Sequence, residues 1–375
     1  MNLTIEEIVR KTPKTRDRYV DFLRAFSIIV VVIGHWLSAV VIKNENGIRV
    51  NNAVGMFPGL WIITRILQVM PLFFFVGGFS NARTINSLKN KGESLSSFYK
   101  KRAVRLLKPT LFFLIFWIVI IIFLILLIPD WQRYRMAIIA TVGPLWFLAV
   151  YPFVTLIAPL MLKLHRAKRL LIPIILLILT VLVDFIRFKF NISAIAWLNV
   201  LFVWTFVHQI GYFYEDGSLA NLSEKWKILI TITGLCVLII LTSTGIFPKS
   251  MIGTGFEKIS NMNPPTICIP FLSLWLIGLA MLLRDGINKW LNNSKPWFFV
   301  ILANRTIMTL YLWHLTAYTI AYLLLYQIGL GHHTIDNIDI WWLERPVFVI
   351  IPLIILIGLI KIFGRLESSV IKEEG

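Results

Sequence analysis

The residues best suited to chemistry stand at the start of the first apolar segment. Asp21 and Arg24 precede a run of aliphatic residues that is interrupted by one histidine, His35. On a helix, the eleven positions from Arg24 to His35 turn the chain about 20° beyond three full turns, so both side chains share one face, about 16 Å apart along the axis. Asp21 lies about 40° from the same line. The spacing predicts a polar line running from the membrane surface toward the middle of the bilayer.

This polar line favours proton transfer, although a structural role is the alternative. An ionisable side chain inside a membrane segment is costly unless it has a partner or a function. Histidine changes its protonation near neutral pH, which suits a general base. In the structural interpretation, Arg24 only marks the cytoplasmic end of the segment, and His35 forms a hydrogen bond with a neighbouring helix. Because the three polar residues share one face, we expect Asp21, Arg24 and His35 to be catalytic.

A second candidate site is the basic stretch KKRAVRLLKP at residues 100–109, before the third apolar segment. Arg102 and Arg105 are three residues apart, so on a helix their guanidinium groups can converge on one anion. Lys101 adds a third cation, and Pro109 is expected to stand at the start of the span. Convergent arginines suit a phosphate-bearing ligand. The alternative is a basic cluster that only anchors the span at the membrane surface.

Two further motifs predict residues that line a cavity. The run MPLFFFVGGFSN at 70–81 places a proline and paired glycines within a span and ends in Asn81. A proline in mid-span frees a backbone carbonyl, and glycines permit close helix contact, so helix packing and a substrate channel are both compatible with it. In a later span, Tyr311 and His314 are placed to share a face, and His314 is expected near the same cavity as His35. A hydrogen bond that holds two helices together is the alternative.

The sequence predicts neither a bound metal nor a bound cofactor. His332 and His333 are adjacent in a loop, but a metal there would need more ligands than we can identify. Cys236 and Cys268 each stand alone in an apolar run, without metal-ligand spacing or a disulfide framework.

Membrane-spanning helices have to position these residues. Of the 375 residues, 58% are hydrophobic, which indicates an all-α, polytopic integral membrane protein. The net charge of +18 lies in short loops between apolar runs, so it indicates the lipid bilayer as partner and not nucleic acid. At about 20 residues per crossing, ten spans are predicted, at 23–42, 61–80, 109–128, 138–162, 169–186, 195–214, 227–247, 266–284, 305–329 and 346–364.

Loop charge predicts the orientation of the chain. With the N-terminus inside, 26 of the 37 Lys and Arg residues fall on the cytoplasmic side and nine on the other, and Arg65 and Arg305 fall within or beside spans. This positive-inside bias predicts both termini in the cytoplasm. We expect one transmembrane domain over residues 1–375, with a short cytoplasmic amphipathic segment at 1–20 and a short cytoplasmic tail at 365–375. The first apolar run is long and lacks a cleavage site, so no cleaved signal peptide is expected.

Taken together, the motifs resemble those of the acyltransferase-3 family of membrane acyltransferases. Arg24 with His35 is similar to that family's Arg-x10-His signature, and Arg102-Ala-Val-Arg105 is similar to its cytoplasmic Arg-x-x-Arg motif. The other two motifs are similar to its second-helix and late-helix patterns. The resemblance covers essentially the whole chain in order. The four motifs are Arg24 with His35, the run MPLFFFVGGF, Arg102-Ala-Val-Arg105, and Tyr311-Leu-Trp313-His314.

The resemblance implies a protein of the bacterial cytoplasmic membrane with about ten transmembrane helices. Members of the family take an acyl group, commonly acetyl, from cytoplasmic acyl-CoA and place it on a hydroxyl of a cell-surface glycan or another acceptor. Some members carry an extracytoplasmic hydrolase-like domain. This sequence resembles the stand-alone form, which leaves open whether a partner protein completes the transfer.

Acyl transfer to a hydroxyl needs a base, stabilisation of the developing oxyanion and a held acyl donor. His35 is assigned either as the general base on the acceptor hydroxyl or as a transient acyl carrier, and the sequence does not choose between these roles. The other assignments place phosphate binding on Lys101, Arg102 and Arg105, orientation of the thioester on Arg24, and positioning of Arg24 on Asp21.

Two other classes of protein share some of these features. Intramembrane histidine and arginine, with helices broken by proline and glycine, are also typical of proton-coupled secondary transporters and lipid-linked sugar flippases. Those proteins predict a repeat of half the spans, which the sequence does not show. A structural membrane scaffold is the third class, but it leaves the aligned charges on the first span unexplained.

Overall fold

The computed structural model describes residues 5–10, 12–13, 16–44, 47–128, 135–333 and 338–373. In these ranges, ten helices are long and apolar enough to cross a membrane, so the prediction of about ten spans in an all-α protein is confirmed. The chain divides into two compact units. The first comprises Met1–Ser27, Gly59–Phe98 and Val150–Asn304, and the second comprises Ile28–Pro58, Tyr99–Ala149 and Arg305–Gly375.

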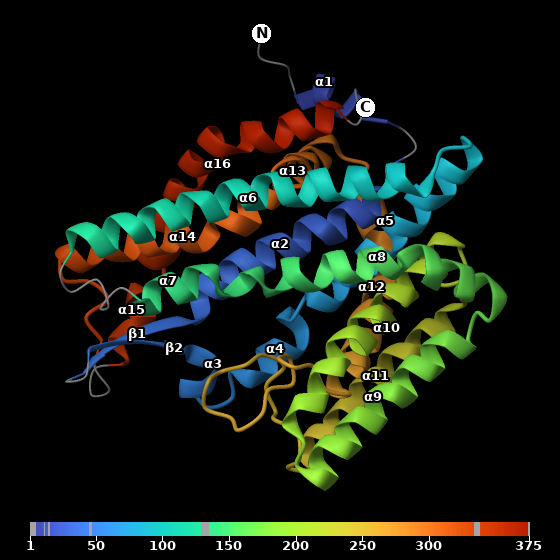
Figure 1. Ribbon diagram of the computed structural model, residues 1–375, viewed down its shortest axis with the longest axis horizontal. Helices are drawn as coiled ribbons and strands as arrows, with labels where there is room; N and C mark the ends of the chain where they lie inside the picture. The colour runs from blue at the N-terminus through green and yellow to red at the C-terminus, as the bar shows by residue number, and fades with distance from the viewer. Residues whose placement is uncertain are drawn as a thin grey trace. The chain divides into compact units, whose positions relative to one another are not determined.

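The regular elements of the first unit are all helices in the residues that the structure describes. Its elements are α1 (Ile5–Arg10), the start of α2 (Arg18–Ser38), α4 (Trp61–Leu67), α5 (Met70–Asn90), most of α8 (Trp146–Ala167), α9 (Leu171–Phe190), η3 (Ser193–Trp197), α10 (Leu198–Glu215), α11 (Glu224–Ser243), α12 (Cys268–Trp290) and α13 (Ser294–Arg305). α10 packs against both α5 and α9, and α11 packs against α12 (Figure 1). These contacts bury the apolar faces of the helices and leave polar side chains between α5, α8 and α10.

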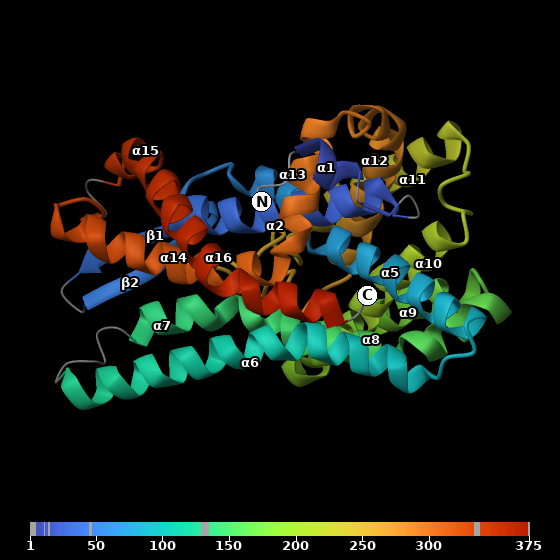
Figure 2. The same ribbon diagram turned by 90° about the horizontal axis from the view of Figure 1, so that it is seen from above.

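The second unit contains the rest of α2 and one β-hairpin, formed by β1 (Ala39–Asn44) and β2 (Gly47–Asn52). Its other elements are helices: α3 (Ala53–Met56), most of α6 (Leu95–Leu127), α7 (Arg135–Val142), η2 (Gly143–Leu145), α14 (Ile307–Gln327), α15 (Ile340–Glu344) and α16 (Val347–Glu373). α14 lies against α16 (Figure 2). At this contact the rings of Trp313 and Phe363 stack in parallel, with centroids 3.9 Å apart.

The first span begins and ends earlier than predicted. We expected a helix to residue 42, but α2 ends at Ser38 and the chain continues as β1, which pairs antiparallel with β2 from Ala39 opposite Asn52. Figure 2 shows the hairpin beyond the end of α2. The residues that leave the helix include Val40, Val41 and Ile42, and β-branched side chains favour strands when a partner strand is available.

One predicted span consists of two helices, and the prolines lie elsewhere in the helices than expected. The span predicted at 61–80 consists of α4 and α5, and Pro71 stands in the first turn of α5 instead of in mid-helix. The first turn tolerates proline because its N–H groups have no helical partner. Conversely, Pro109 does not begin a span but lies inside the continuous helix α6. Thr306 separates α13 from α14, so His314 lies near the start of a helix of its own.

The fourth predicted span is also interrupted. We expected one helix over 138–162, but the short 3-10 helix η2 at Gly143–Leu145 separates α7 from α8.

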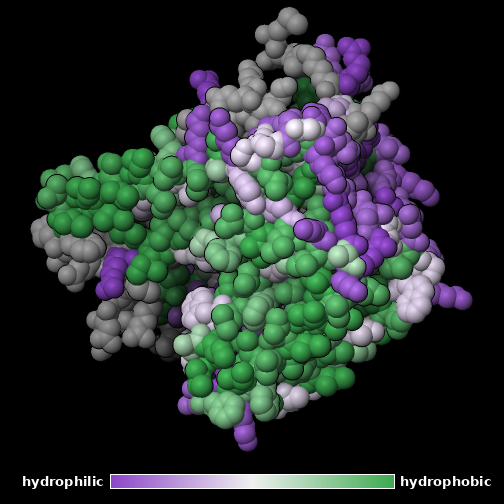
Figure 3. All heavy atoms as spheres, turned by 45° about the vertical axis from the view of Figure 1, so that its right-hand side comes forward, coloured by the Kyte–Doolittle hydropathy of each residue, from purple (hydrophilic) through white to green (hydrophobic). Residues whose placement is uncertain are grey.

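Large apolar side chains stay exposed on the spans, as lipid contact requires. Leu126 on α6 is 74% exposed and Ile178 on α9 is 60% exposed. Figure 3 shows hydrophobic residues over much of the visible surface.

Close helix contact explains the paired glycines. Where α5 meets α10, a Cβ on Gly78 would lie 1.9 Å from the carbonyl oxygen of His208, and a Cβ on Gly211 would lie 2.2 Å from that of Phe75. Both obstacles are backbone atoms, so a rotamer change cannot relieve the overlap. The geometry therefore supports the helix-packing interpretation of the motif at 70–81.

We predict that Gly211→Ala loosens the contact between α5 and α10. Overpacking of this kind costs roughly 1–3 kcal/mol, so the melting temperature in detergent should fall. Gly286→Ala on α12 is the matched control, because no atom lies within 4 Å of a Cβ at that position. Equal melting temperatures for the two variants would contradict the packing assignment.

Candidate functional site

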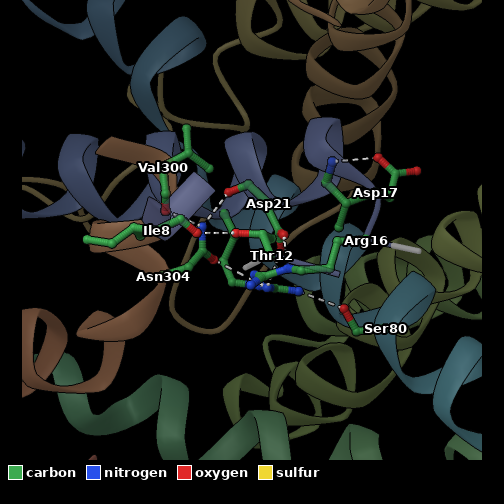
Figure 4. Close-up of polar contacts among 10 residues, drawn as sticks. Ile8, Thr12, Arg16, Asp17, Asp21, Ser80, Val300 and Asn304 are labelled. Carbon is green, nitrogen blue, oxygen red and sulfur yellow. Dashed lines mark hydrogen bonds and ion pairs between the residues drawn. The ribbon is translucent and has the colours of Figure 1, made fainter. Parts of the chain in front are cut away.

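Asp21 and Arg24, which the sequence singled out, are in direct contact in the first unit. The buried carboxylate of Asp21 accepts hydrogen bonds from two arginines: Oδ2 from Nε of Arg16 at 2.7 Å, and Oδ1 from Nη1 of Arg24 at 3.1 Å. Asp21 stands in the first turn of α2, where the helix dipole also stabilises a negative charge. Figure 4 shows the polar contacts around Asp21. Asp21 thus orients the guanidinium group of Arg24.

Two polar residues from other helices complete the surroundings of Arg24. Its Nη1 also donates to Oδ1 of Asn304 at 3.3 Å, and its Nη2 donates to Oγ of Ser80 at 2.8 Å. Asn304 is fixed in turn, because its Nδ2 donates to the carbonyl oxygens of Asp21 and Val300 at 2.8 and 2.9 Å. Figure 4 shows Ser80 and Asn304 approaching from separate elements, α5 and α13. Three helices therefore hold one guanidinium group.

Sequence reasoning assigned Asn81, and not its neighbour Ser80, to the site. Asn81 is fully buried between α5, α8 and α10, where its Nδ2 lies 3.3 Å from Oγ1 of Thr155 and 3.0 Å from Nε2 of His208. Successive residues on a helix point about 100° apart. Ser80 therefore contacts Arg24, whereas Asn81 contacts Thr155 and His208. The available signal for Ser80 and Asn304 was a polar residue at the end of an apolar run.

His35 and His314 form a pair in the second unit. Nε2 of His314 lies 3.3 Å from Nδ1 of His35, and the ring centroids are 5.1 Å apart. Nδ1 of His35 lies 2.8 Å from the carbonyl oxygen of Val31, and Nδ1 of His314 lies 2.7 Å from that of Tyr311. The structure thus brings together three of the predicted residues, His35, His314 and Tyr311.

The carbonyl contacts determine where the protons sit on the neutral rings. A carbonyl oxygen only accepts hydrogen bonds, so Nδ1 carries the proton in both histidines. Nε2 of His314 is then an acceptor. The Nδ1 proton of His35 is shared between this nitrogen and the carbonyl oxygen of Val31. Nε2 of His35 is left with a lone pair and makes no hydrogen bond to any residue that the structure describes. That nitrogen has what a general base or a nucleophile needs.

Trp36 and Arg345 hold the histidine pair in place. Trp36, the residue after His35, is buried, and its Nε1 donates to the carbonyl oxygen of His314 at 2.9 Å. Nη1 of Arg345 donates to the carbonyl oxygens of Trp36 and Ala39 at 3.4 and 3.2 Å, so a cation binds the C-terminal end of α2, where the helix dipole favours it. From the sequence, Arg345 counted only as a loop charge, because its partners are more than 300 positions away.

The predicted basic site lies on α6 in the second unit. Lys101, Arg102 and Arg105 are half-buried, and the two arginines stand three residues apart on one helix, as the motif requires. Because α6 is unbroken at Pro109, this basic stretch and the following span form one continuous rod. The structure thus confirms the helical spacing of the two arginines, and side chains three residues apart on a helix are neighbours on its surface.

A buried carboxylate lies within the segment 365–375 that we expected to form a tail. α16 continues through this segment to Glu373, and Glu367 is only 2% exposed. Its carboxylate accepts hydrogen bonds from the backbone N–H groups of Met308 and Thr309, each at 3.0 Å, and from the hydroxyl of Thr309 at 2.9 Å. Glu367 therefore binds the first turn of α14.

This contact caps the helix that carries Tyr311 and His314. The N-cap residue Thr306 supplies no side-chain cap, so the first N–H groups of α14 take their acceptor from α16. Burial raises the pKa of the Glu367 carboxyl above its ordinary value, while the three hydrogen bonds and the positive charge of Arg105 act in the opposite direction. Glu367 thus caps α14 with three hydrogen bonds.

We predict that Glu367→Ala destabilises the protein by about 1–2 kcal/mol, the usual effect of losing a helix N-cap. The melting temperature in detergent should fall, and hydrogen exchange should rise in the first turn of α14. Lys361→Ala, an exposed residue on the same helix, is the control. If both variants melt together with the unaltered protein, Glu367 does not cap α14.

A further polar network joins α8 to α10 in the first unit. Nε2 of His165 lies 3.0 Å from Oδ2 of Asp216, and Nδ1 of His165 lies 2.9 Å from Nε2 of Gln209. Burial would raise the pKa of Asp216, but hydrogen bonds from Ser218, His165 and Arg169 lower it to about 2. This network fastens the adjacent ends of the two helices.

The adjacent histidines of the loop before α15 have separate partners. Nε2 of His333 lies 3.0 Å from Oε2 of Glu344, and the ring of His332 stacks on Tyr326 with centroids 3.9 Å apart. Among the described residues, no group of three metal-ligating side chains is placed to hold a metal ion. Residues 334–337 of this loop lie outside the described part of the chain.

The family model for the acyltransferase-3 domain, described as an acyltransferase domain, matches residues 17–361, nearly the whole chain. The protein therefore belongs to the acyltransferase-3 family and is a multi-pass membrane acyltransferase, in agreement with its ten candidate spans. No curated protein and no solved structure matches the chain significantly.

Proposed function

We propose that the protein moves an acyl group, most simply acetyl, from cytoplasmic acyl-CoA to a hydroxyl of an extracytoplasmic glycan or a similar acceptor. The observation that carries this proposal is the state of His35 within an acyltransferase-3 domain. Its Nδ1 is held by the carbonyl of Val31, and its Nε2 retains a lone pair with no hydrogen bond among the described residues. The acyl transfer that the family performs needs such a group.

In one route, His35 acts as a general base. Nε2 takes the proton of the acceptor hydroxyl while the hydroxyl oxygen attacks the thioester carbonyl. The C–S bond breaks, the acyl group stays on the oxygen as an ester, and the CoA sulfur leaves and receives the proton from His35. His314 supports this step, because its Nε2 accepts a hydrogen bond from the opposite nitrogen of the His35 ring and so stabilises the imidazolium.

In the second route, His35 carries the acyl group. Nε2 attacks the thioester carbonyl directly, the C–S bond breaks, and CoA leaves as the thiol after receiving one proton. The acceptor hydroxyl then attacks the acyl-imidazole, which forms the ester and regenerates the neutral ring. Both routes use the same nitrogen, so the geometry supports either one.

Arg24 is the group proposed to receive and orient the thioester end of the donor, since helix geometry places it about 16 Å from His35 along the axis. Asp21, Asn304 and Ser80 hold this guanidinium with three hydrogen bonds, so the group is already oriented before the donor binds. α2 carries Arg24 and His35 on one unbroken helix. Asp21 is a positioning residue in this proposal, because it acts through Arg24.

The phosphates of acyl-CoA are proposed to bind Lys101, Arg102 and Arg105. Guanidinium groups match phosphate oxygens in pairs, and a lysine adds a point charge. The proposed cellular location is the bacterial cytoplasmic membrane, with both termini in the cytoplasm. The excess of Lys and Arg in one set of loops supports this orientation. In that orientation the basic stretch faces the cytoplasmic donor.

We predict that His35→Ala lowers the transfer of radiolabelled acetyl from acetyl-CoA by about 10²–10⁴-fold, the usual contribution of a general base. The assay uses purified protein in liposomes with an envelope glycan as acceptor. His332→Ala, which changes a loop histidine stacked on Tyr326, should retain activity. Full activity of His35→Ala would end the proposal. Mass spectrometry of the protein, with label found on His35, distinguishes the carrier route from the base route.

We predict that Arg102→Gln and Arg105→Gln each raise the KM for acetyl-CoA by about tenfold or more, because hydrogen bonds to charged groups contribute about 1.5–3 kcal/mol. The charge reversal Arg102→Glu with Arg105→Glu should raise it further. Lys91→Gln removes an exposed cation from the same inter-helix region and should leave the KM unchanged. An unchanged KM in the arginine variants would mean that the cluster only anchors α6.

A further inference from the structure

Two cations share one tryptophan ring at the start of α4 in the first unit. The guanidinium carbon of Arg65 lies 4.6 Å from the centroid of the Trp61 ring, and Nζ of Lys249 lies 5.7 Å from it. The two charges are therefore no farther apart than the sum of these distances. Trp61 and Arg65 are four residues apart on α4 and so lie on one face of the helix.

The surrounding contacts hold the Arg65 guanidinium and the backbone near Lys249 in position. Nη2 of Arg65 donates to Oγ1 of Thr242 at 2.8 Å, and its carbonyl oxygen accepts from Nε1 of Trp275 at 3.0 Å. The loop that carries Lys249 is fastened two residues later, where the N–H of Met251 donates to Oγ1 of Thr64 at 2.9 Å. The arrangement thus joins α4, the end of α11, α12 and the loop between those two helices.

No described carboxylate neutralises this pair of charges. Neither Arg65 nor Lys249 forms an ion pair within the ranges that the structure describes. Glu257, which stands in the same loop as Lys249, is bound instead to the backbone N–H and hydroxyl of Thr254. Unpaired like charges at this distance repel each other, more strongly near apolar surroundings than in water. The pair is therefore suited to an anion that another molecule supplies.

The rest of α4 indicates what kind of molecule supplies that anion. Four aliphatic residues on this seven-residue helix are about half exposed: Ile62 at 53%, Ile63 at 47%, Ile66 at 52% and Leu67 at 44%. The helix belongs to a candidate membrane span. A soluble anion has no use for such a surface, whereas an amphiphile places its hydrocarbon chain there and its charged head at the cations.

We propose that Trp61, Arg65 and Lys249 form a binding site for the phosphate group of a membrane lipid. The guanidinium fork and the ammonium point charge match two phosphate oxygens, and the exposed aliphatic face of α4 receives the lipid chain. The site lies in the first unit and uses none of the residues assigned to acyl transfer. It therefore does not rest on the proposed function.

Native mass spectrometry of the purified protein in detergent, without acyl-CoA, tests the site directly. The protein is titrated with a polyprenyl phosphate and, separately, with phosphatidylglycerol. We expect Arg65→Gln and Lys249→Gln each to weaken binding of the preferred lipid by about tenfold, since each loses one charge-assisted contact. Lys258→Gln, which removes an exposed lysine from the same loop, is the matched control and should bind like the unaltered protein.

The outcomes separate the sources of the phosphate. Tighter binding of the polyprenyl phosphate identifies a lipid carrier, and tighter binding of phosphatidylglycerol identifies an ordinary headgroup. Either result supports the site when Arg65→Gln and Lys249→Gln both weaken binding of the preferred lipid. Equal binding by all variants overturns the proposal, and so does displacement of the lipid by inorganic phosphate at an equal concentration. Should Arg65→Gln fail to fold, Lys249→Gln decides alone, because Lys249 is an exposed loop residue. The same titration in His35→Ala shows that binding is independent of turnover.

Discussion

Charged side chains between membrane helices cannot rely on water, so each needs a partner supplied by the protein. In this protein several of those partners are the ends of helices. Asp21 lies in the first turn of α2, Arg345 binds carbonyl groups at the last turn of the same helix, and Glu367 binds N–H groups at the first turn of α14. In each case the sign of the charge matches the helix dipole. Arg345 and Glu367, which would destabilise the fold if isolated, instead complete hydrogen bonds that a helix end leaves open.

The same constraint separates side chains that are fully engaged from one that is not. The carboxylates of Asp21 and Glu367 each accept two or three hydrogen bonds, and the guanidinium group of Arg24 is held by partners from three helices. His35 differs, because only one of its ring nitrogens is bound within the described residues. Val31 and His314 fix the orientation of the His35 ring through Nδ1, so the lone pair on its other nitrogen is held in one direction, as preorganised catalysis requires.

Local periodicity made the main helices and the alignment of Arg24 with His35 predictable. Apolar runs of the right length located all ten spans, and one helical repeat placed both residues on one face. Contacts between distant segments were not predictable in this way. Asn304 is 280 positions from Arg24, and Glu367 is 58 positions from Thr309, so neither pairing leaves a periodic signal in a single sequence. The break before Met70 left only a weak signal, the single polar residue Gln68, whereas the break at Thr306 coincides with the polar run Asn304-Arg305-Thr306.

The cap that Glu367 places on α14 has a consequence for how the protein is made. A ribosome adds Glu367 more than fifty residues after His314. Until that glutamate arrives, the first N–H groups of α14 lack the acceptor that they have in the folded protein, and the start of the helix is free to fray. The helix that carries His314 is therefore completed late in synthesis. A nascent chain that stalls in α16 before Glu367 already contains His35 and its neighbour His314, but the helix that holds His314 is uncapped.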